Sequence, residues 1–198
     1  MSGGGDKGSY EASVFIEFTN LLPKEDVSYD VVTGASAGSL NGAGLSLFAP
    51  GDEEDAAIFI YGLWNSISTK DILEMWDEGL VKAIFNKGGI FNNQPLIDFL
   101  YKQIGLNTIR KKFTVVLTNA ETGHPDFVDY NSTDVMPPDA IPTIVGSSAL
   151  PFAFPPMHLN NNTYIDGGSI WNLNVAGAVR RCKEVVDNDE DIIIDILV

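Results

Sequence analysis

The chain has 198 residues, of which 44% are hydrophobic and 20% charged, which is the composition of one globular domain with a sizeable core. Its 12 Lys and Arg against 27 Asp and Glu give a formal charge of −15, which excludes the basic surface needed to bind a nucleic-acid backbone. The single cysteine, Cys182, excludes an internal disulfide and favours a reducing compartment, and no apolar run reaches the roughly 18 residues of a membrane span, so only peripheral membrane contact is expected.

The first quarter of the chain alternates helical and strand patterns. A Gly-rich stretch, residues 3–8, leads into residues 9–22, whose apolar side chains recur every three or four positions as in an amphipathic helix. Residues 27–33 are β-branched and predict a short strand, and residues 39–48 return to helical spacing. The sequence Pro50-Gly51-Asp52 predicts a stop, with Asp52 capping the next helix.

The rest of the chain continues this alternation. Residues 52–104 are predicted to be mostly helical with breaks at Gly79 and at residues 87–89, and the clearest helix ends at Gly105. The later elements are expected as a strand over 112–123, its hairpin partner over 125–131, a short helix and loop over 138–156, a strand entering a glycine turn over 162–169, a helix from 171 to 182 and a final strand over 191–198. Strands alternating with helices predict an α/β fold with a mainly parallel sheet covered on both faces.

A serine framed by glycines lies where the first predicted strand meets the next helix. Ser36 has Gly34 two positions before it and Gly38 two positions after it, the spacing of a nucleophile elbow. Small residues are needed there because the tight turn crowds the backbone while it exposes the serine oxygen. The helix that follows also points its positive end at the reaction centre. The alternative is a Gly- and Ser-rich turn without chemistry.

A nucleophilic serine needs a base, and Asp166 is the best candidate. Most such hydrolases use a histidine, but His124 lies in a predicted hairpin turn and His158 follows two prolines. Asp166 ends a predicted strand and precedes Gly167 and Gly168, whose lack of side chains permits close backbone approach. The alternative is an aspartate that only stabilises a tight turn.

The Gly-rich stretch at residues 3–8, here called the glycine loop, fits two interpretations. It matches the spacing of a dinucleotide-phosphate loop, which requires a strand before it and an acidic residue about 20 positions later. Glu25 and Asp26 are near that distance but lie in a predicted loop. Backbone amides at a helix start serve an oxyanion equally well. The oxyanion role is favoured because a candidate nucleophile and base are also present.

These three elements, in this order, resemble the patatin-like phospholipase family: "SGGGDKG", then "GASAG", then "DGG". The similarity extends through "YDVVTGASAGSLNGAG" and "VGSSALPFAFPP", and the neighbouring segments resemble patatin-like proteins of protists. The resemblance implies a three-layer α/β/α fold and hydrolysis of acyl esters in lipids, of the phospholipase A or lysophospholipase type, without histidine, metal or cofactor. By matching position, Ser36 is the nucleophile, Asp166 is the base, and Gly3, Gly4, Gly5 and Gly8 carry the oxyanion-stabilising amides.

The sequence departs from the family pattern at both ends. Lys7 stands where many members have Arg, a mild change. The strand that precedes the glycine loop is missing, as is whatever follows Val198, so residues 1–198 are expected to form a single but incomplete patatin-like domain. Loss of that strand is expected to leave backbone groups unpaired and to loosen the glycine loop.

The resemblance also implies what the protein meets in the cell. The expected partners are a phospholipid or other acyl-lipid substrate and the surface of a membrane or micelle, and not nucleic acid. The cytoplasm or a membrane surface is the favoured location, with secretion left open. The alternative function is a catalytically inactive patatin-like protein that binds lipid.

Overall fold

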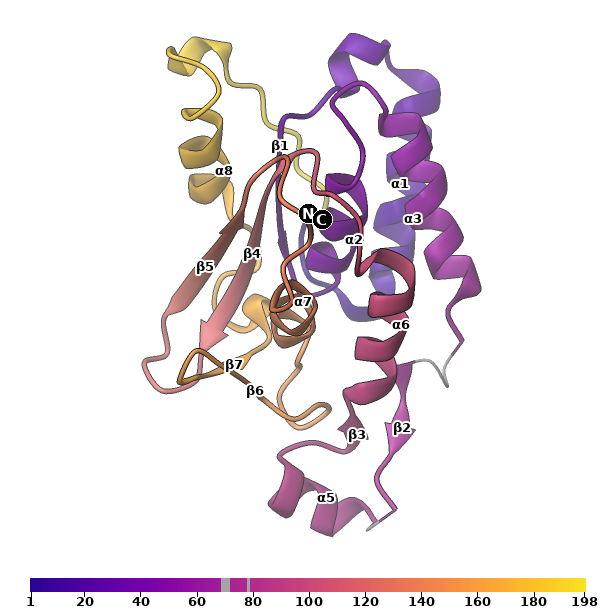
Figure 1. The fold of residues 1–198 in the computed structure, drawn as a ribbon, viewed down its shortest axis with the longest axis vertical. Helices are drawn as coiled ribbons and strands as arrows, with labels where there is room; N and C mark the ends of the chain where they lie inside the picture. The colour runs from indigo at the N-terminus through magenta and orange to yellow at the C-terminus, as the bar shows by residue number, and fades with distance from the viewer. Residues whose placement is uncertain (69–71, 78) are drawn as a thin grey trace.

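The main sheet positions the site. The computed structural model describes residues 1–68, 72–77 and 79–198. Within these residues the main sheet consists of β1 (Val31–Ala35), β4 (Lys112–Asn119), β5 (Pro125–Tyr130), β6 (Met157–Leu159) and β7 (Asn162–Ile165). A separate pair of two-residue strands, β2 (Glu74–Met75) and β3 (Phe91–Asn92), lies at the lower end of the molecule (Figure 1).

The strand that precedes the predicted nucleophile turn pairs in parallel with its neighbour. β1 and β4 are parallel neighbours, with Val31 opposite Lys112 and Ala35 opposite Val116. The pairs β4–β5, β4–β7 and β6–β7 are antiparallel. The parallel pair is joined by helices, whereas the added strands come from hairpins, of which the first turns at Gly123 with a φ of 71° that favours glycine.

Helices cover the sheet on both faces. They are α1 (Gly8–Leu21), α2 (Ala37–Ser46), α3 (Glu53–Ser66), α5 (Leu80–Lys87), α6 (Gln94–Ile104), α7 (Ala140–Ser147) and α8 (Val175–Cys182). α8 packs on one face, and α2 and α7 pack on the other, with α1 and α3 outside α2 (Figure 1). The three-layer α/β/α fold is confirmed. None of the described helices is long and apolar enough to cross a membrane.

Close packing between α2, α7 and β4 sets the position of the nucleophile turn. Phe113 and Leu117 lie on the same face of β4 because strand side chains alternate. A Cβ added to Gly42 in α2 would lie 3.0 Å from the Phe113 ring, and one added to Gly146 in α7 would lie 3.1 Å from Leu117. Both helices therefore approach the sheet closely, and the start of α2 is held at the carboxyl end of β1.

Two predicted local features differ from the structure. Asp52 occupies the N-cap of α3, but its side chain makes no capping hydrogen bond. The neighbouring Glu53 carboxylate instead accepts the N–H of Gly51 at 2.7 Å, so the start of α3 is stabilised from one position further along.

The strands β2, β3 and β6 were not predicted. They are only two or three residues long, too short for a period-2 pattern to reveal them.

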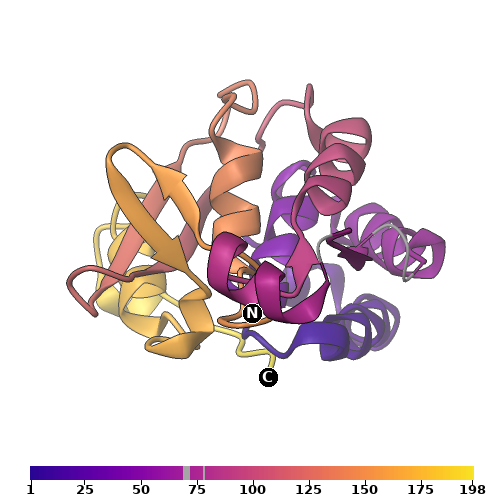
Figure 2. The ribbon, with the colours of Figure 1, turned by 90° about the horizontal axis from the view of Figure 1, so that it is seen from below.

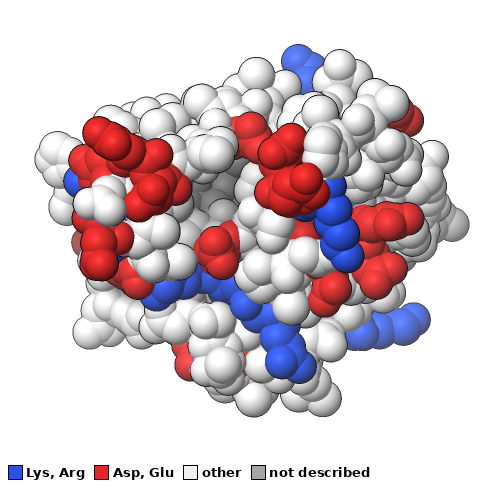
Figure 3. Space-filling view, turned by 90° about the horizontal axis from the view of Figure 1, so that it is seen from above, with Lys and Arg blue, Asp and Glu red and all other residues white. Residues whose placement is uncertain are grey.

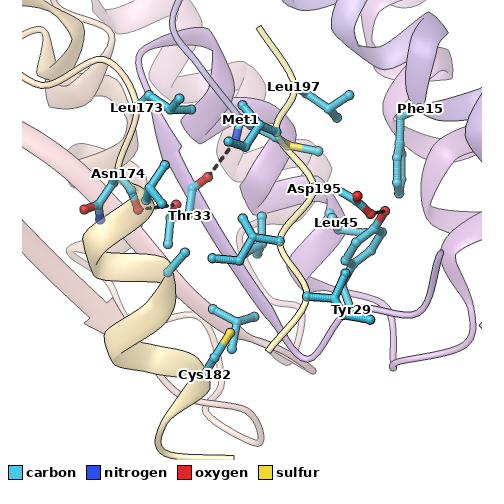
Figure 4. Close-up of a pocket in the computed structure, with 17 residues that line it drawn as sticks. Met1, Phe15, Tyr29, Thr33, Leu45, Leu173, Asn174, Cys182, Asp195 and Leu197 are labelled. Atoms are coloured by element: carbon cyan, nitrogen blue, oxygen red, sulfur yellow. Dashed lines mark hydrogen bonds between the residues drawn. The ribbon is translucent and has the colours of Figure 1, made fainter. Parts of the chain in front are cut away.

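The final strand expected over residues 191–198 is not formed. After η4 (Asp189–Asp191) the chain is irregular, and it runs beside the free edge of β1 with a cavity between them (Figure 4). The Met1 amino group donates to the Thr33 carbonyl and the Ser2 N–H donates to the Leu197 carbonyl. The two termini therefore lie side by side (Figure 1), and the apolar run pairs with none of the described strands.

Charge is unevenly distributed over the upper end of the molecule. Figure 3 shows acidic side chains gathered in separate groups around a hollow, with a band of Lys and Arg between them. The basic groups on this face are thus flanked by carboxylates and form no extended basic surface of the kind that binds a phosphate backbone.

Candidate active site

Ser36 lies in the turn between β1 and α2. Its backbone has φ 52° and ψ −127°, a combination that non-glycine residues rarely adopt. A Cβ added to Gly34 would lie 2.1 Å from the Gly38 carbonyl oxygen, and one added to Gly38 would lie 2.5 Å from the carbonyl oxygens of Met1 and Ser2. Both positions therefore exclude a side chain, as a sharp turn that presents the serine requires.

Asp166 reaches Ser36 from the neighbouring strand β7, because Ile165 pairs with Thr118 of β4, two positions beyond Val116, the partner of Ala35. β7 ends at Ile165, and Asp166 starts the turn of residues 166–168, here called the base turn. The Ser36 hydroxyl donates to Asp166 Oδ2 at 2.6 Å, and the Gly168 N–H donates to Asp166 Oδ1 at 2.7 Å. Both carboxylate oxygens thus have a donor. The structure brings the two predicted residues into direct contact, while their catalytic roles stay a prediction.

The surroundings of Asp166 favour its protonated form. Ser36 and Asp166 are both buried, with 9% and 4% of their surfaces exposed. Burial raises the pKa of the Asp166 carboxyl, and the hydrogen bonds from Ser36 and Gly168 offset part of that rise. A raised pKa makes Asp166 a stronger base than a solvated aspartate, which suits it to accept a proton from a hydroxyl.

Two serines that sequence reasoning did not single out hold the nucleophile turn. The Ser36 N–H donates to Ser147 Oγ at 2.9 Å, and Ser147 in turn donates to the Val116 carbonyl at 2.6 Å. Ser148 donates to the Ser36 carbonyl at 3.1 Å. Both come from the end of α7, in the "VGSSALPF" segment. No local pattern could have assigned these roles, because Ser36 lies more than 100 positions away from both serines.

Neither histidine takes part in the contacts of the dyad. His124 is exposed in the turn between β4 and β5. His158 is exposed on β6, where its Nδ1 lies 3.2 Å from Thr163 Oγ1. Among the described hydrogen bonds, the partner of the Ser36 hydroxyl is Asp166 alone.

The glycine loop passes directly over Ser36. Seen from below in Figure 2, the N-terminal segment runs between the start of α1 and the segment that follows β7. A Cβ added to Gly3 would lie 2.6 Å from Ser36 Cβ, so Gly3 is packed against the nucleophile. A Cβ added to Gly8 would lie 2.5 Å from the Trp64 ring and 3.0 Å from Ala37 Cβ, which makes Gly8 a packing position at the start of α1.

The four predicted oxyanion glycines differ in their free donors. The Gly3 N–H donates to Asn172 Oδ1 at 2.7 Å, and the Gly8 N–H donates to carbonyls of the preceding η1 turn (Gly5–Lys7). For Gly4 and Gly5 no acceptor is found among the described residues. Gly5 also has a φ of 62°, which places it in the region that favours glycine. Two of the four predicted amides thus have no acceptor among the described residues, and the other two are already paired.

These groups together can carry out acyl transfer. A serine hydroxyl bonded to a buried carboxylate, with the glycine loop packed against the serine, has the groups that acyl transfer would use as nucleophile, base and charge stabilisation. No cluster of three or more His, Cys, Asp or Glu side chains that could hold a metal occurs in the described part of the chain. The cavity shown in Figure 4 is lined by neither Ser36 nor Asp166 and lies beside the first residues of β1, from Val31 to Thr33.

Comparison with known proteins gives three findings. The sequence model of a family described as patatin-like phospholipase matches residues 1–179. Over 100 residues the chain is 29% identical to the "Probable lipid hydrolase 463L" of Invertebrate iridescent virus 6. This match covers 44% of this chain and 33% of the viral protein. The fold is similar to that of VipD from Legionella pneumophila, with a TM-score of 0.56 and 17% identity, over 87% of this chain and 46% of VipD. The chain matches less than half the length of either relative.

Proposed function

This chain belongs to the patatin-like phospholipase family, and from that premise we propose that it hydrolyses carboxylic esters of acyl lipids, with Ser36 as nucleophile and Asp166 as base. The observation that carries the proposal is the 2.6 Å hydrogen bond from the Ser36 hydroxyl to a buried Asp166 carboxylate. A serine in a turn without chemistry has no need for a carboxylate at this distance in a buried position, because burying a charge is costly.

The reaction would proceed in two halves. Ser36 Oγ attacks the ester carbonyl carbon while its proton passes to Asp166, and the N–H groups of Gly4 and Gly5 meet the oxygen that becomes negative. Collapse of this intermediate breaks the ester bond, and the departing alcohol takes the proton from Asp166. Water then attacks the acyl-Ser36 ester while Asp166 takes its proton, and this proton passes to Ser36 Oγ as the fatty acid is released. One such amide donor typically contributes about 3 kcal/mol to lowering the barrier.

The proposed substrates are phospholipids or lysophospholipids. The family description and the name of the viral relative, a probable lipid hydrolase, support a lipid ester. Large apolar side chains are also exposed on the two segments that flank the dyad. Leu150 and Phe152 follow Ala149, whose carbonyl accepts the Asp166 N–H, and Ile170 and Trp171 follow the base turn.

A lipid surface is the partner that these side chains suit. The Phe152 side chain is 73% exposed, although burying a large apolar side chain is favourable. Its backbone has a φ of 69°, which bulky residues rarely adopt. Insertion of such side chains into acyl chains would place the dyad at the lipid surface. We expect Phe152→Ser to lower sedimentation with phosphatidylcholine vesicles while hydrolysis of soluble p-nitrophenyl butyrate is retained.

A fluorophosphonate probe tests the proposed chemistry because it labels only an activated serine. The wild-type protein should be labelled, and Ser36→Ala and Asp166→Asn should not be. Release of fatty acid from phosphatidylcholine and from lysophosphatidylcholine then separates phospholipase A from lysophospholipase activity. If the wild-type protein binds vesicles but neither reacts with the probe nor releases fatty acid, it is the inactive lipid-binding protein instead.

A further inference from the structure

We propose that Asn172 is a positioning residue that joins the glycine loop to the base turn and so determines which loop amides receive the oxyanion. The inference rests on the proposed function, because it concerns the loop that would stabilise the reacting ester. It assigns a role to a side chain that no motif in the sequence marks.

The Asn172 side chain pairs with the backbone of Gly3 in both directions. Its Oδ1 accepts the Gly3 N–H at 2.7 Å, and its Nδ2 donates to the Gly3 carbonyl at 3.2 Å. An amide that satisfies both the N–H and the C=O of one residue fixes the orientation of the two peptide groups that flank this residue, as well as its position. This pairing spans 169 positions of sequence.

The same amide also packs against the base turn. A Cβ added to Gly168 would lie 2.6 Å from Asn172 Oδ1, and one added to Gly3 would lie at the same distance from this atom. Gly168 is the residue whose N–H holds the Asp166 carboxylate. Asn172 therefore lies between the loop and the turn, and any side chain on either glycine would displace it.

This arrangement decides the use of the loop amides. Because Asn172 occupies the Gly3 N–H, that group is not available to an oxyanion. The pairing instead presents the next two residues, Gly4 and Gly5, whose N–H groups have no acceptor among the described residues. Since an oxyanion donor must be within a fraction of an ångström of its productive place, loss of Asn172 should impair the chemical step.

Asn174 provides a matched structural control two positions away. Its side chain caps α8 by accepting the Gly177 N–H at 3.0 Å and has no described contact with the glycine loop. Asn174→Ala removes an asparagine from the same segment and weakens a helix cap. It should lower the melting temperature and leave kcat of the folded protein unchanged.

The experiment measures kcat and KM for p-nitrophenyl butyrate in the wild-type protein and in Asn172→Ala, Asn172→Asp and Asn174→Ala. For Asn172→Ala we expect kcat to fall by about 10- to 100-fold, with KM changed little, because the loop moves without loss of the acyl site. For Asn172→Asp we expect a stronger loss at high pH, since an ionised carboxylate cannot donate to the Gly3 carbonyl and repels the developing oxyanion.

The pH dependence separates positioning from simple stabilisation. The ratio of kcat for Asn172→Asp to that for the wild-type protein should rise as the pH falls from about 6 to about 4, the range in which an exposed aspartate becomes protonated, and the ratio for Asn172→Ala should stay flat. The inference is overturned if Asn172→Ala keeps kcat within about twofold, or loses activity only in step with its folded fraction as Asn174→Ala does. Failure of the wild-type protein to react with a fluorophosphonate would instead refute the proposed function.

Discussion

The Ser36 hydroxyl donates directly to the Asp166 carboxylate, 2.6 Å away, with no imidazole between them. In a triad the histidine transfers the proton and the aspartate only orients it. Here the carboxylate itself is in contact with the nucleophile, so the ionisation of Asp166 alone should control whether the base is available.

The first prediction concerns the pH dependence of activity. Burial raises the pKa of Asp166 above the ordinary 3.8, and the base works only when ionised. Activity should therefore be lost as the pH falls through this raised pKa, at a higher pH than for a solvated aspartate. The profile of kcat/KM against pH reports this group in the free enzyme. A profile that stays flat down to pH of about 4 would contradict the assignment.

The second prediction concerns the stability of Asp166→Asn. A carboxyl whose pKa is higher in the folded than in the unfolded chain adds stability below its unfolded pKa, and that stability is lost as the pH rises through the folded pKa. At neutral pH the ionised Asp166 is therefore a net cost. Asparagine is neutral, can accept the Gly168 N–H and can donate to Ser36. We expect Asp166→Asn to be inactive but to have a higher free energy of unfolding at pH 7.

Denaturant titrations at two pH values check this expectation. The difference in unfolding free energy between Asp166→Asn and the wild-type protein should shrink as the pH approaches 4, where the wild-type carboxyl is also neutral. A variant that is less stable than the wild-type protein at both pH values would show that the charge is favourable in the fold.

Much of the site could be predicted from local signals. Ser36 and Asp166 each follow a short strand and precede small residues, so each turn is visible within about ten residues of sequence. The glycine loop is visible for the same reason. The role of Asn172 could not be predicted, because its partner Gly3 is 169 positions away and depends on the finished fold.

The errors in the fold have a related cause. Residues 191–198 have the composition of a buried strand, but a strand forms only where a neighbour accepts its backbone hydrogen bonds. In the structure a cavity separates this segment from β1 (Figure 4). The hairpin partner predicted over 125–131 is confirmed as β5, which is antiparallel to β4. The pairing of β7 with β4 could not be predicted, because it joins segments that are far apart in the sequence.

The third prediction tests the crowding at the nucleophile turn. In Gly34→Ala the new Cβ would meet the Gly38 carbonyl oxygen at 2.1 Å, a clash with backbone that no rotamer relieves. We expect activity to be lost and the free energy of unfolding to fall by about 3 kcal/mol, the upper end for overpacking.

Gly62, inside α3, has no atom within 4 Å of an added Cβ. Gly62→Ala should therefore raise stability by about 0.5–1 kcal/mol and leave activity unchanged. Equal effects of the two variants would mean that the turn is not tight.

The fourth prediction concerns a buried ion pair at the end of the β1–β4 pair opposite to Ser36. Lys111 Nζ lies 2.8 Å from Glu53 Oε1, and both side chains are buried. Burial lowers the pKa of Lys111, although Glu53 acts to raise it. Lys111→Met would leave Glu53 buried without a counter-charge, and we expect the free energy of unfolding to fall by about 3–5 kcal/mol.

An exposed pair offers the matched control. Lys112 Nζ lies 2.8 Å from Glu184 Oε2, the same distance, but both side chains reach solvent. Lys112→Met should cost less than about 1 kcal/mol. Adding Glu53→Gln to Lys111→Met should restore part of the lost stability, because the unpaired charge is removed. If Lys111→Met costs no more than Lys112→Met, the Glu53 carboxylate is not dehydrated as the structure describes.

The last prediction distinguishes the glycines of the loop by the space around them. An added Cβ at Gly3 would lie 2.6 Å from both Ser36 Cβ and Asn172 Oδ1, so Gly3→Ala must push the loop away from the nucleophile. At Gly4 the nearest atom to an added Cβ is Lys7 Cβ, at 3.2 Å, which a small shift of an exposed side chain can accommodate. We expect Gly3→Ala to lower kcat by about 100-fold or more, the effect of a displaced oxyanion donor, and Gly4→Ala to keep most of its activity. Rates of fluorophosphonate labelling and of p-nitrophenyl butyrate hydrolysis measure the difference, with thermal unfolding as the check on folding. If Gly3→Ala reacts as fast as the wild-type protein, the loop does not approach Ser36 during the reaction, and the oxyanion must be stabilised by other groups.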